Sequence, residues 1–142
     1  MEARLQLRVQ RYGWDKASGS YESGWRDQLA PAHDLLLELA DPTEGERVVE
    51  TACGTGLVTL RVARSVGAHG RVAATDLSDE MVAITAGRCR HEGLAERVEV
   101  RRMSAEALDF ADRSFDLALC ALGLMYVPDP SIALQEMHRV LE

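Results

Sequence analysis

The chain has 142 residues, 46% of them hydrophobic, and a formal net charge of −7. This length favours a single domain, and the composition is typical of a globular protein rather than a disordered or fibrous one. The negative charge, without a long basic run, argues against nucleic acid as a partner, and no apolar run approaches the length of a membrane span. The N-terminus has no apolar signal core, so we expect a cytoplasmic protein.

Cysteine and histidine are few and scattered. The three cysteines are Cys53, Cys89 and Cys120, no C-x-x-C pair occurs, and the four histidines are spread along the chain. We therefore expect neither a disulfide framework nor a bound metal.

Residues 1–42 are predicted to form an N-terminal helical segment ahead of a domain over residues 43–142. Up to about Gly24 the sequence mixes aromatic residues with glycine and serine, which indicates part helix and part loop. Pro31 suits the first turn of a helix that continues through "AHDLLLELA", and Asp41-Pro42 ends it.

From residue 43 onward, strand and helix patterns alternate. The predicted strands are "RVVET" (47–51), "RVAATD" (71–76), "RVEVRR" (97–102) and "FDLALCAL" (115–122). The predicted helices cover residues 55–66, a stretch that Ser78 caps and Gly93 closes, and a last one that opens at Asp129-Pro130. Alternation with short joints predicts an α/β protein, with a Rossmann-like doubly wound parallel sheet.

The stretch "VVETACGTGLVTL", Val48 to Leu60, is the first candidate binding element. Small residues between a strand and a helix let a ligand lie against bare backbone, and the helix start offers free N–H groups. Asp76 ends the second strand, twenty positions after Gly56, where an acid can accept hydrogen bonds from ribose hydroxyls. Together they predict a nucleoside-containing ligand.

The spacing within this loop separates two cofactor classes. A dinucleotide fingerprint begun at Gly54 would need a glycine where Thr59 stands. Begun at Glu50, the pattern is acid-x-small-x-Gly-x-Gly, which resembles the first motif of class I S-adenosylmethionine-dependent methyltransferases, usually with glycine in place of Ala52. "ATDLSDEMV" resembles the second motif of that family. The resemblance continues to Glu142 and is nearest to the ubiquinone and menaquinone biosynthesis C-methyltransferases.

The resemblance implies a set of cofactor-binding residues. Glu50 would organise the methionine end of S-adenosylmethionine, and Asp76 would hold the ribose. Ser104 stands where relatives commonly carry aspartate, so as a neutral acceptor it implies a weaker bond to adenine. The complete implied set is Glu50, Ala52, Cys53, Gly54, Gly56, Asp76, Leu77, Met81, Ser104 and Ala105.

Each of these residues also has a simpler interpretation. Gly54 and Gly56 could merely form a tight turn and Asp76 a turn acid, but their joint spacing with Glu50 favours a ligand site. Cys53 fits a crowded loop better than the role of a nucleophile.

The N-terminal aromatic residues allow two interpretations as well. Tyr12, Trp14 and Tyr21 could be packing residues, or one of them closes over the cofactor. Tyr21 is the best candidate for that role because its hydroxyl could meet the cofactor carboxylate.

The predicted function is methyl transfer from S-adenosylmethionine to a small-molecule acceptor. In-line displacement at the methyl group needs position and a dry pocket, so we assign no catalytic residue. The acceptor is expected to be apolar or aromatic, from the neutral "LGLMY" segment and the resemblance. The alternatives are a non-catalytic or fragmentary cofactor-binding module and a nicotinamide-dependent oxidoreductase.

The fourth strand carries the last expectation. The resemblance implies the strand order 3-2-1-4 and further strands after a segment like "HRVLE", whereas this sequence ends there. We therefore expect a sheet truncated after the fourth strand and its helix. The almost wholly apolar fourth strand would be an edge through which the chain self-associates.

Overall fold

A computed structural model describes residues 2–142 of the chain. In chain order, its elements are α1 (Ala3–Ala40), β1 (Arg47–Thr51), α2 (Leu57–Ser65), β2 (Arg71–Asp76), α3 (Asp79–His91), β3 (Val98–Arg102), β4 (Leu117–Cys120), the short 3-10 helix η1 (Leu124–Tyr126) and α4 (Pro130–Val140).

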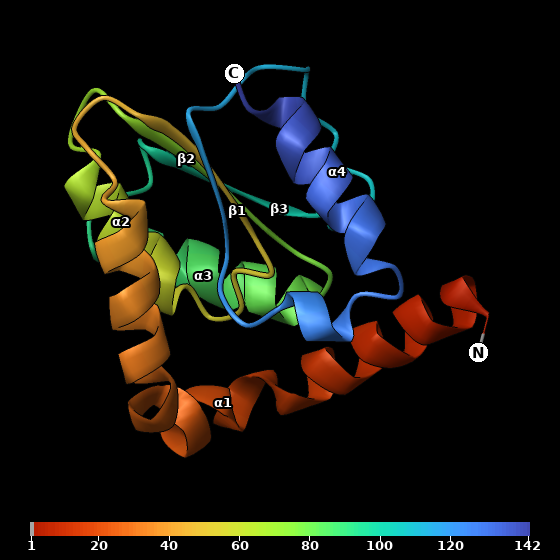
Figure 1. Cartoon of the computed structure of the whole chain (residues 1–142). Helices are drawn as coiled ribbons and strands as arrows, with labels where there is room; N and C mark the ends of the chain where they lie inside the picture. Colours follow the sequence, from red (N-terminus) through yellow and green to blue (C-terminus); the bar gives the residue numbers. More distant parts are fainter. Residues whose placement is uncertain (1) are drawn as a thin grey trace.

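The four strands form one parallel sheet in the order β3-β2-β1-β4, which confirms the predicted order and the α/β class (Figure 1). Thr51 at the end of β1 is paired with Thr75 on one side and Cys120 on the other. Asp76 is paired with Arg102. The carboxyl ends of all four strands therefore meet at one edge, where parallel sheets of this kind bind ligands.

Helices cover both faces of the sheet. Because successive strand residues point to opposite sides, neighbouring side chains pack against different helices. Val48 belongs to an apolar cluster that includes α2 residues and Cys89 of α3. Its neighbour Val49 packs with Phe115 and with Val140 of α4. All of these side chains are less than one-tenth exposed. Burial on both faces explains why consecutive residues are buried along β1 and β2, whereas β3 at the edge carries Glu99 and Arg102 exposed.

The predicted strand ends hold for β1 and β2, while β4 is shorter than predicted. Its ladder runs only from Leu117 to Cys120, because Leu122 takes a left-handed backbone (φ 58°) that turns the chain away. Phe115 instead forms an isolated bridge with Leu141. The predicted cap is confirmed, since Ser78 Oγ accepts from Met81 N (3.1 Å). The last helix opens at Asp129-Pro130 as predicted, and the structure adds that the Asp129 side chain accepts from Ser131 N (3.0 Å).

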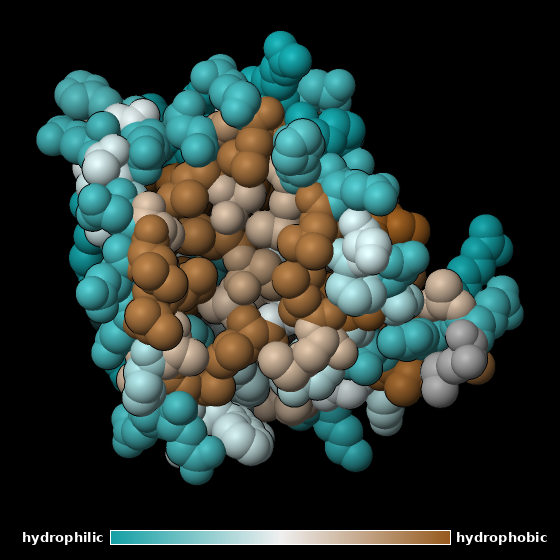
Figure 2. All heavy atoms as spheres, viewed as in Figure 1, coloured by the Kyte–Doolittle hydropathy of each residue, from teal (hydrophilic) through white to brown (hydrophobic). Residues whose placement is uncertain are grey.

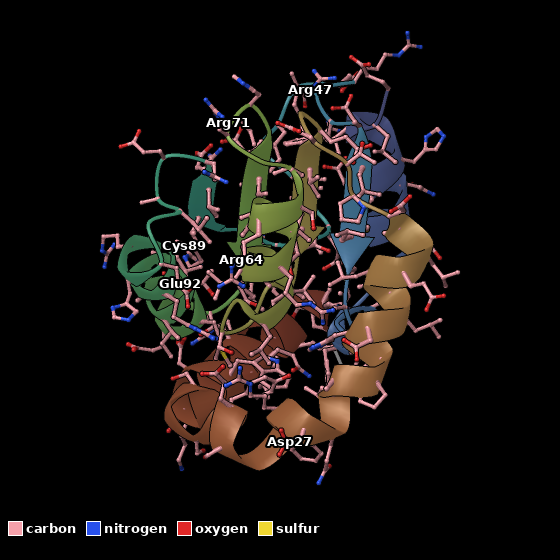
Figure 3. All side chains as sticks on the ribbon, turned by 90° about the vertical axis from the view of Figure 1, so that its left-hand side faces the viewer. Asp27, Arg47, Arg64, Arg71, Cys89 and Glu92 are labelled. Atoms are coloured by element: carbon pink, nitrogen blue, oxygen red, sulfur yellow. The ribbon has the colours of Figure 1, made fainter. Side chains whose placement is uncertain are left out.

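The expectation of loops within the first 24 residues is wrong, because Ala3–Ala40 is helical throughout. Pro31 lies inside this helix rather than in its first turn. A proline has no N–H to donate to the carbonyl four residues earlier, here that of Asp27. Figure 1 shows α1 turning a sharp corner, and Figure 3 places Asp27 at that corner.

Because of the bend, the two halves of α1 contact different parts of the molecule. The second half packs alongside α2, with Leu36, Leu37 and Ala40 against the core. The first half runs across the carboxyl ends of the strands (Figure 1). Side chains anchor α1 to the helices behind it through Arg11 with Asp79, Glu22 with Arg88, and Asp34 with Arg61. Each such partly exposed pair contributes only about 0–1 kcal/mol, so apolar contacts decide where α1 lies.

The opposite end of the sheet carries charges of its own. In Figure 3, Arg47 and Arg71 lie at the amino ends of β1 and β2, far from Asp27. Nearer the middle, Arg64 of α2 pairs with Glu92 at the end of α3.

Residues 2–142 contain neither a helix that could cross a membrane nor a cluster of metal ligands. Although α1 is 38 residues long, neither it nor any other described helix carries the apolar stretch that a membrane crossing needs. Within the same range, no three His, Cys, Asp or Glu side chains gather as ligands for a metal ion.

Candidate functional site

A cavity of about 310 Å³ lies where the carboxyl ends of the strands face the first half of α1. Its walls come from α1, from the loops after β1, β2 and β3, and from the segment after β4. The lining residues are Leu7, Gln10, Trp14, Tyr21, Trp25, Leu29, Ala52, Gly54, Asp76, Leu77, Met81, Met103, Ser104, Ala105, Ala121, Leu122, Gly123, Met125, Tyr126, Val127 and Pro128. The size is sufficient for a small organic ligand.

The loop after β1 presents backbone to this cavity, as the sequence predicted. Gly54 has a left-handed backbone (φ 56°), and a Cβ added there would meet no atom within 4 Å. The loop is fixed from behind, since Cys53 N donates to Thr75 O (2.9 Å) and Gly54 N donates to Asp76 Oδ2 (2.9 Å). Gly54 therefore offers a ligand an approach that any larger residue would fill.

Asp76 organises the turn after β2 and also lines the cavity. Its Oδ1 accepts from Ser78 N (2.9 Å) and its Oδ2 from Gly54 N. Burial raises the pKa of the carboxyl, and the backbone hydrogen bonds oppose that shift. Each carboxylate oxygen has a second lone pair, so Asp76 can bind ligand hydroxyls without giving up these bonds.

Glu50 lies beneath the cavity rather than in its lining. The side chain is 1% exposed, and its Oε2 accepts from Thr59 Oγ1 (2.5 Å). Burial raises the pKa of Glu50 to about 8, the Thr59 hydrogen bond opposes the shift, and the charge of Asp76 adds to it. Glu50 is therefore mainly protonated at pH 7 while no cation lies nearby.

This buried acid makes stability depend on pH. The carboxyl titrates near 4.5 when unfolded and near 8 when folded, so its contribution is complete below pH 4.5 and is lost as pH rises toward 8. We expect the free energy of unfolding to fall by about 1.4 kcal/mol per pH unit in this window, and Glu50→Gln to remove that slope. Urea titrations at several pH values measure it, with the exposed Glu99→Gln as control. Equal slopes in wild type and Glu50→Gln would contradict the assignment.

Two other predicted residues shape the loop without lining the cavity. Cys53 is 6% exposed and belongs to the core cluster around Val48. Gly56 faces α3, where an added Cβ would lie 3.0 Å from Cγ2 of Thr85. The Thr85 hydroxyl donates to Gly54 O (2.8 Å). Cys53 and Gly56 therefore hold the loop in place from its protein side.

The loops after β2 and β3 supply a mostly apolar part of the lining. Leu77, Met81, Ser104 and Ala105, which the resemblance implies as cofactor-binding residues, all line the cavity. The backbone N–H of Met81 donates to Ser78 Oγ, and the Met81 residue is 2% exposed. Ser104 Oγ accepts from Glu106 N (3.3 Å), which keeps the turn after β3 compact.

Sequence reasoning missed most of the wall that α1 contributes. Trp14 lies edge-on to Tyr21 (ring centroids 5.9 Å apart) and to Tyr126 (5.0 Å). Tyr21, the candidate for closing over the cofactor, does line the cavity, whereas Tyr12 is 71% exposed on the surface. The sequence did contain a signal for this wall. Leu7, Trp14 and Tyr21 recur every seven residues, and side chains at this spacing share one face of a helix.

The charge of the lining restricts the ligand. Asp76 is the one carboxylate that lines the cavity, and no described lining residue is Lys or Arg. A phosphate-bearing ligand would lack the cations that usually accompany phosphate. The cavity therefore suits a neutral or cationic molecule with hydroxyl groups and a large apolar surface.

A comparison with protein families decides the relationship. Residues 48–142, from β1 to the end of the chain, match the family described as "Methyltransferase domain". The chain belongs to the methyltransferase domain family. The resemblance first drawn from the loop and from Asp76 is thereby confirmed.

Relatives of this methyltransferase domain include a ubiquinone/menaquinone biosynthesis C-methyltransferase of Klebsiella pneumoniae. It is 40% identical over 108 residues, which are 76% of this chain and 43% of the relative. The domain spans about half the length, or somewhat less, of the curated relatives it matches.

Two solved structures show the same fold. A SAM-dependent methyltransferase from Aquifex aeolicus has a TM-score of 0.71 and 25% identity, covering 78% of this chain and 58% of its own. The cyclase SpnF has a TM-score of 0.71 and 34% identity, covering 78% of this chain and 40% of its own. The Rossmann-like prediction is confirmed.

Proposed function

We propose that this domain binds S-adenosylmethionine in the cavity at the carboxyl ends of the strands and directs its methyl group to a small neutral acceptor. The observation that carries the proposal is the pairing of Gly54 with Asp76. Bare backbone and a hydroxyl-binding carboxylate stand side by side in a cavity whose lining has no Lys or Arg. A sulfonium nucleoside has the ribose and the positive charge that such a lining suits.

The residues present fit this cofactor. Asp76 would bind the ribose hydroxyls, and Leu77 and Met81 would pack against the adenine, which Ser104 and Ala105 would meet at its edge. Ala52 and Gly54 would face the methionine end, with Tyr21 opposite them on α1.

Glu50 would act on the same end from beneath the loop. An ammonium group above it would lower the pKa of this carboxyl from about 8 and draw out its proton. Cys53 and Gly56 would contribute through the shape of the loop.

The chemistry needs little from the protein beyond position. S-adenosylmethionine supplies an activated methyl group on a sulfonium centre. The chain holds the two reactants in line and excludes water through the apolar walls of α1 and residues 122–128. We assign no general base. An apolar or aromatic acceptor is supported by the aromatic side chains of Trp14, Tyr21 and Tyr126 in the lining.

A second candidate function is cofactor binding without methyl transfer. The similarity to SpnF favours it, since that protein is named as a cyclase at 34% identity. Two observations disfavour a nicotinamide-dependent oxidoreductase. No described lining residue is Lys or Arg, and Thr59 of α2 stands where the dinucleotide fingerprint needs a glycine, with its hydroxyl donating to Glu50 of β1.

Calorimetric titration separates these functions. We expect S-adenosylhomocysteine and S-adenosylmethionine to bind and NADH to give no heat of binding. Transfer of a labelled methyl group to a panel of neutral aromatic acceptors then tests turnover. Binding without transfer to any of them would favour the second candidate, and binding of NADH alone would overturn the proposal.

The exposed edge of the sheet supports self-association. β4 consists of Leu117, Ala118, Leu119 and Cys120 and has no charged side chain to discourage pairing. Figure 2 shows apolar side chains gathered over this side of the molecule, within a hydrophilic rim. The helices on either side carry exposed apolar residues, including Leu35 and Leu39 of α1 and Ile132 of α4. A second copy of the chain would cover this face.

Charge placed on this face should weaken the association. Leu39 is 78% exposed, so Leu39→Lys leaves the core intact and adds a desolvation penalty to any contact. We expect the weight-average mass of wild type to rise with concentration and that of Leu39→Lys to rise less, by sedimentation or light scattering. Leu5→Lys, on the other half of α1 and 49% exposed, is the matched control. A wild-type monomer at all concentrations would refute self-association.

A further inference from the structure

The residue types at positions 52 and 123 are the reverse of what their backbones favour. Ala52 has φ 54°, in the left-handed region where glycine is preferred. Gly123 has φ −100° and ψ −29°, a conformation open to any residue. Backbone geometry therefore explains neither the alanine nor the glycine.

Space explains both. A Cβ built on Gly123 would lie 2.4 Å from Cβ of Ala52 and 3.1 Å from Sγ of Cys120. A carbon–carbon distance of 2.4 Å is far below van der Waals contact, at about 3.5–4.0 Å. The gap between the loop after β1 and the turn after β4 thus holds a single methyl group, and Ala52 supplies it.

The contact joins two walls of the cavity. Ala52 belongs to the glycine-containing loop, and Gly123 lies near the start of the wall formed by residues 122–128, called here the 122–128 wall. Gly123 O accepts from Tyr126 N (3.0 Å), and the Tyr126 ring lies edge-on to Trp14 (5.0 Å). A shift at Gly123 therefore moves Tyr126 against α1.

We propose that Ala52 and Gly123 form a complementary pair in which the alanine methyl group sets the position of the 122–128 wall relative to the cofactor loop. In this pair both act as positioning residues, since their contact sets where the 122–128 wall lies, although both also line the cavity. Only the ligand readout below rests on the proposed function.

Moving the methyl group from one side of the gap to the other tests the pair. Gly123→Ala puts two methyl groups into space for one, and we expect affinity for S-adenosylhomocysteine to fall at least about tenfold. Ala52→Gly empties the space. The double variant Ala52→Gly/Gly123→Ala restores one methyl group, so its affinity should return to within about threefold of wild type. Gly123→Ala combined with Cys120→Ala should stay defective, because the severe overlap is with Ala52.

A second readout needs no ligand. In a Trp25→Phe background Trp14 is the single tryptophan, so its emission reports the contact with Tyr126. We expect Gly123→Ala to change this emission and the double variant to return it toward wild type. Circular dichroism melts on the same proteins show whether each variant folds.

Three results would overturn the proposed pairing. They are a Gly123→Ala protein that behaves like wild type in both readouts, a double variant Ala52→Gly/Gly123→Ala no better than Gly123→Ala, and a return of affinity to the wild-type value when Cys120→Ala is added to Gly123→Ala. If wild type fails to bind S-adenosylhomocysteine, the proposed function fails, and the emission cycle still decides the fate of the pair.

Discussion

Replacing Gly54 by valine is expected to abolish binding of S-adenosylmethionine. A Cβ at Gly54 would meet no protein atom within 4 Å, and Gly54 lines the cavity, so we expect the valine methyl groups to occupy the place of the ligand. We expect the dissociation constant to rise by more than about 100-fold, which corresponds to roughly 2.7 kcal/mol. Calorimetric titration with S-adenosylhomocysteine measures it.

A second glycine separates this effect from backbone strain. Gly93 also has a left-handed backbone (φ 69°) with no atom within 4 Å of an added Cβ, but it lies outside the cavity lining. Gly93→Val should cost similar stability and leave binding intact. Equal loss of binding in Gly54→Val and Gly93→Val would show that strain, and not occupancy, is responsible.

Cys53→Ser provides a chemical control in the same loop. Burial raises the pKa of the Cys53 thiol, so it stays protonated and unreactive. Binding and turnover should survive this substitution. A Cys53→Ser protein that binds the cofactor and has lost all turnover would indicate covalent chemistry in place of direct transfer.

Asp76→Ala is expected to weaken cofactor binding by roughly 10- to 150-fold, the equivalent of about 1.5–3 kcal/mol for hydrogen bonds to a charged acceptor. The structure adds a second effect. Asp76 also accepts from the backbone N–H groups of Gly54 and Ser78, so the variant should unfold at a lower temperature while remaining folded at 25 °C. Titration and a thermal melt on the same protein measure both.

Asp15→Ala tests whether the two effects are separate. Asp15 of α1 accepts from Ser78 Oγ (2.5 Å) and is absent from the cavity lining. Removing it weakens the same turn without removing a ligand contact, so stability should fall and affinity should change little. An Asp76→Ala protein that binds as tightly as wild type would exclude Asp76 from the ribose site.

The sequence by itself determined the elements whose signals are local. β1 and β2 were placed at their observed residues because strands buried on both faces are short continuous apolar runs. Ser78 was identified as a cap, and Asp129-Pro130 as the start of the last helix, because these signals reach only two or three residues along the chain. The spacing of Glu50, Gly54 and Asp76 indicated a candidate binding loop, and the order of the strands came with the resemblance to the methyltransferases.

Only the tertiary structure decided the features that depend on distant contacts. Glycines and serines in the first 24 residues favour loops locally, but α1 is helical throughout, and its side chains contact distant parts of the chain, such as Trp14 against Tyr126. Glu50 and Gly56 proved to face the protein rather than the cavity. Glu50 accepts a hydrogen bond from Thr59 of α2, and Gly56 lies close to Thr85 of α3. The fit of Ala52 against Gly123 joins segments far apart in the sequence, and packing of this kind leaves no periodic trace along the chain.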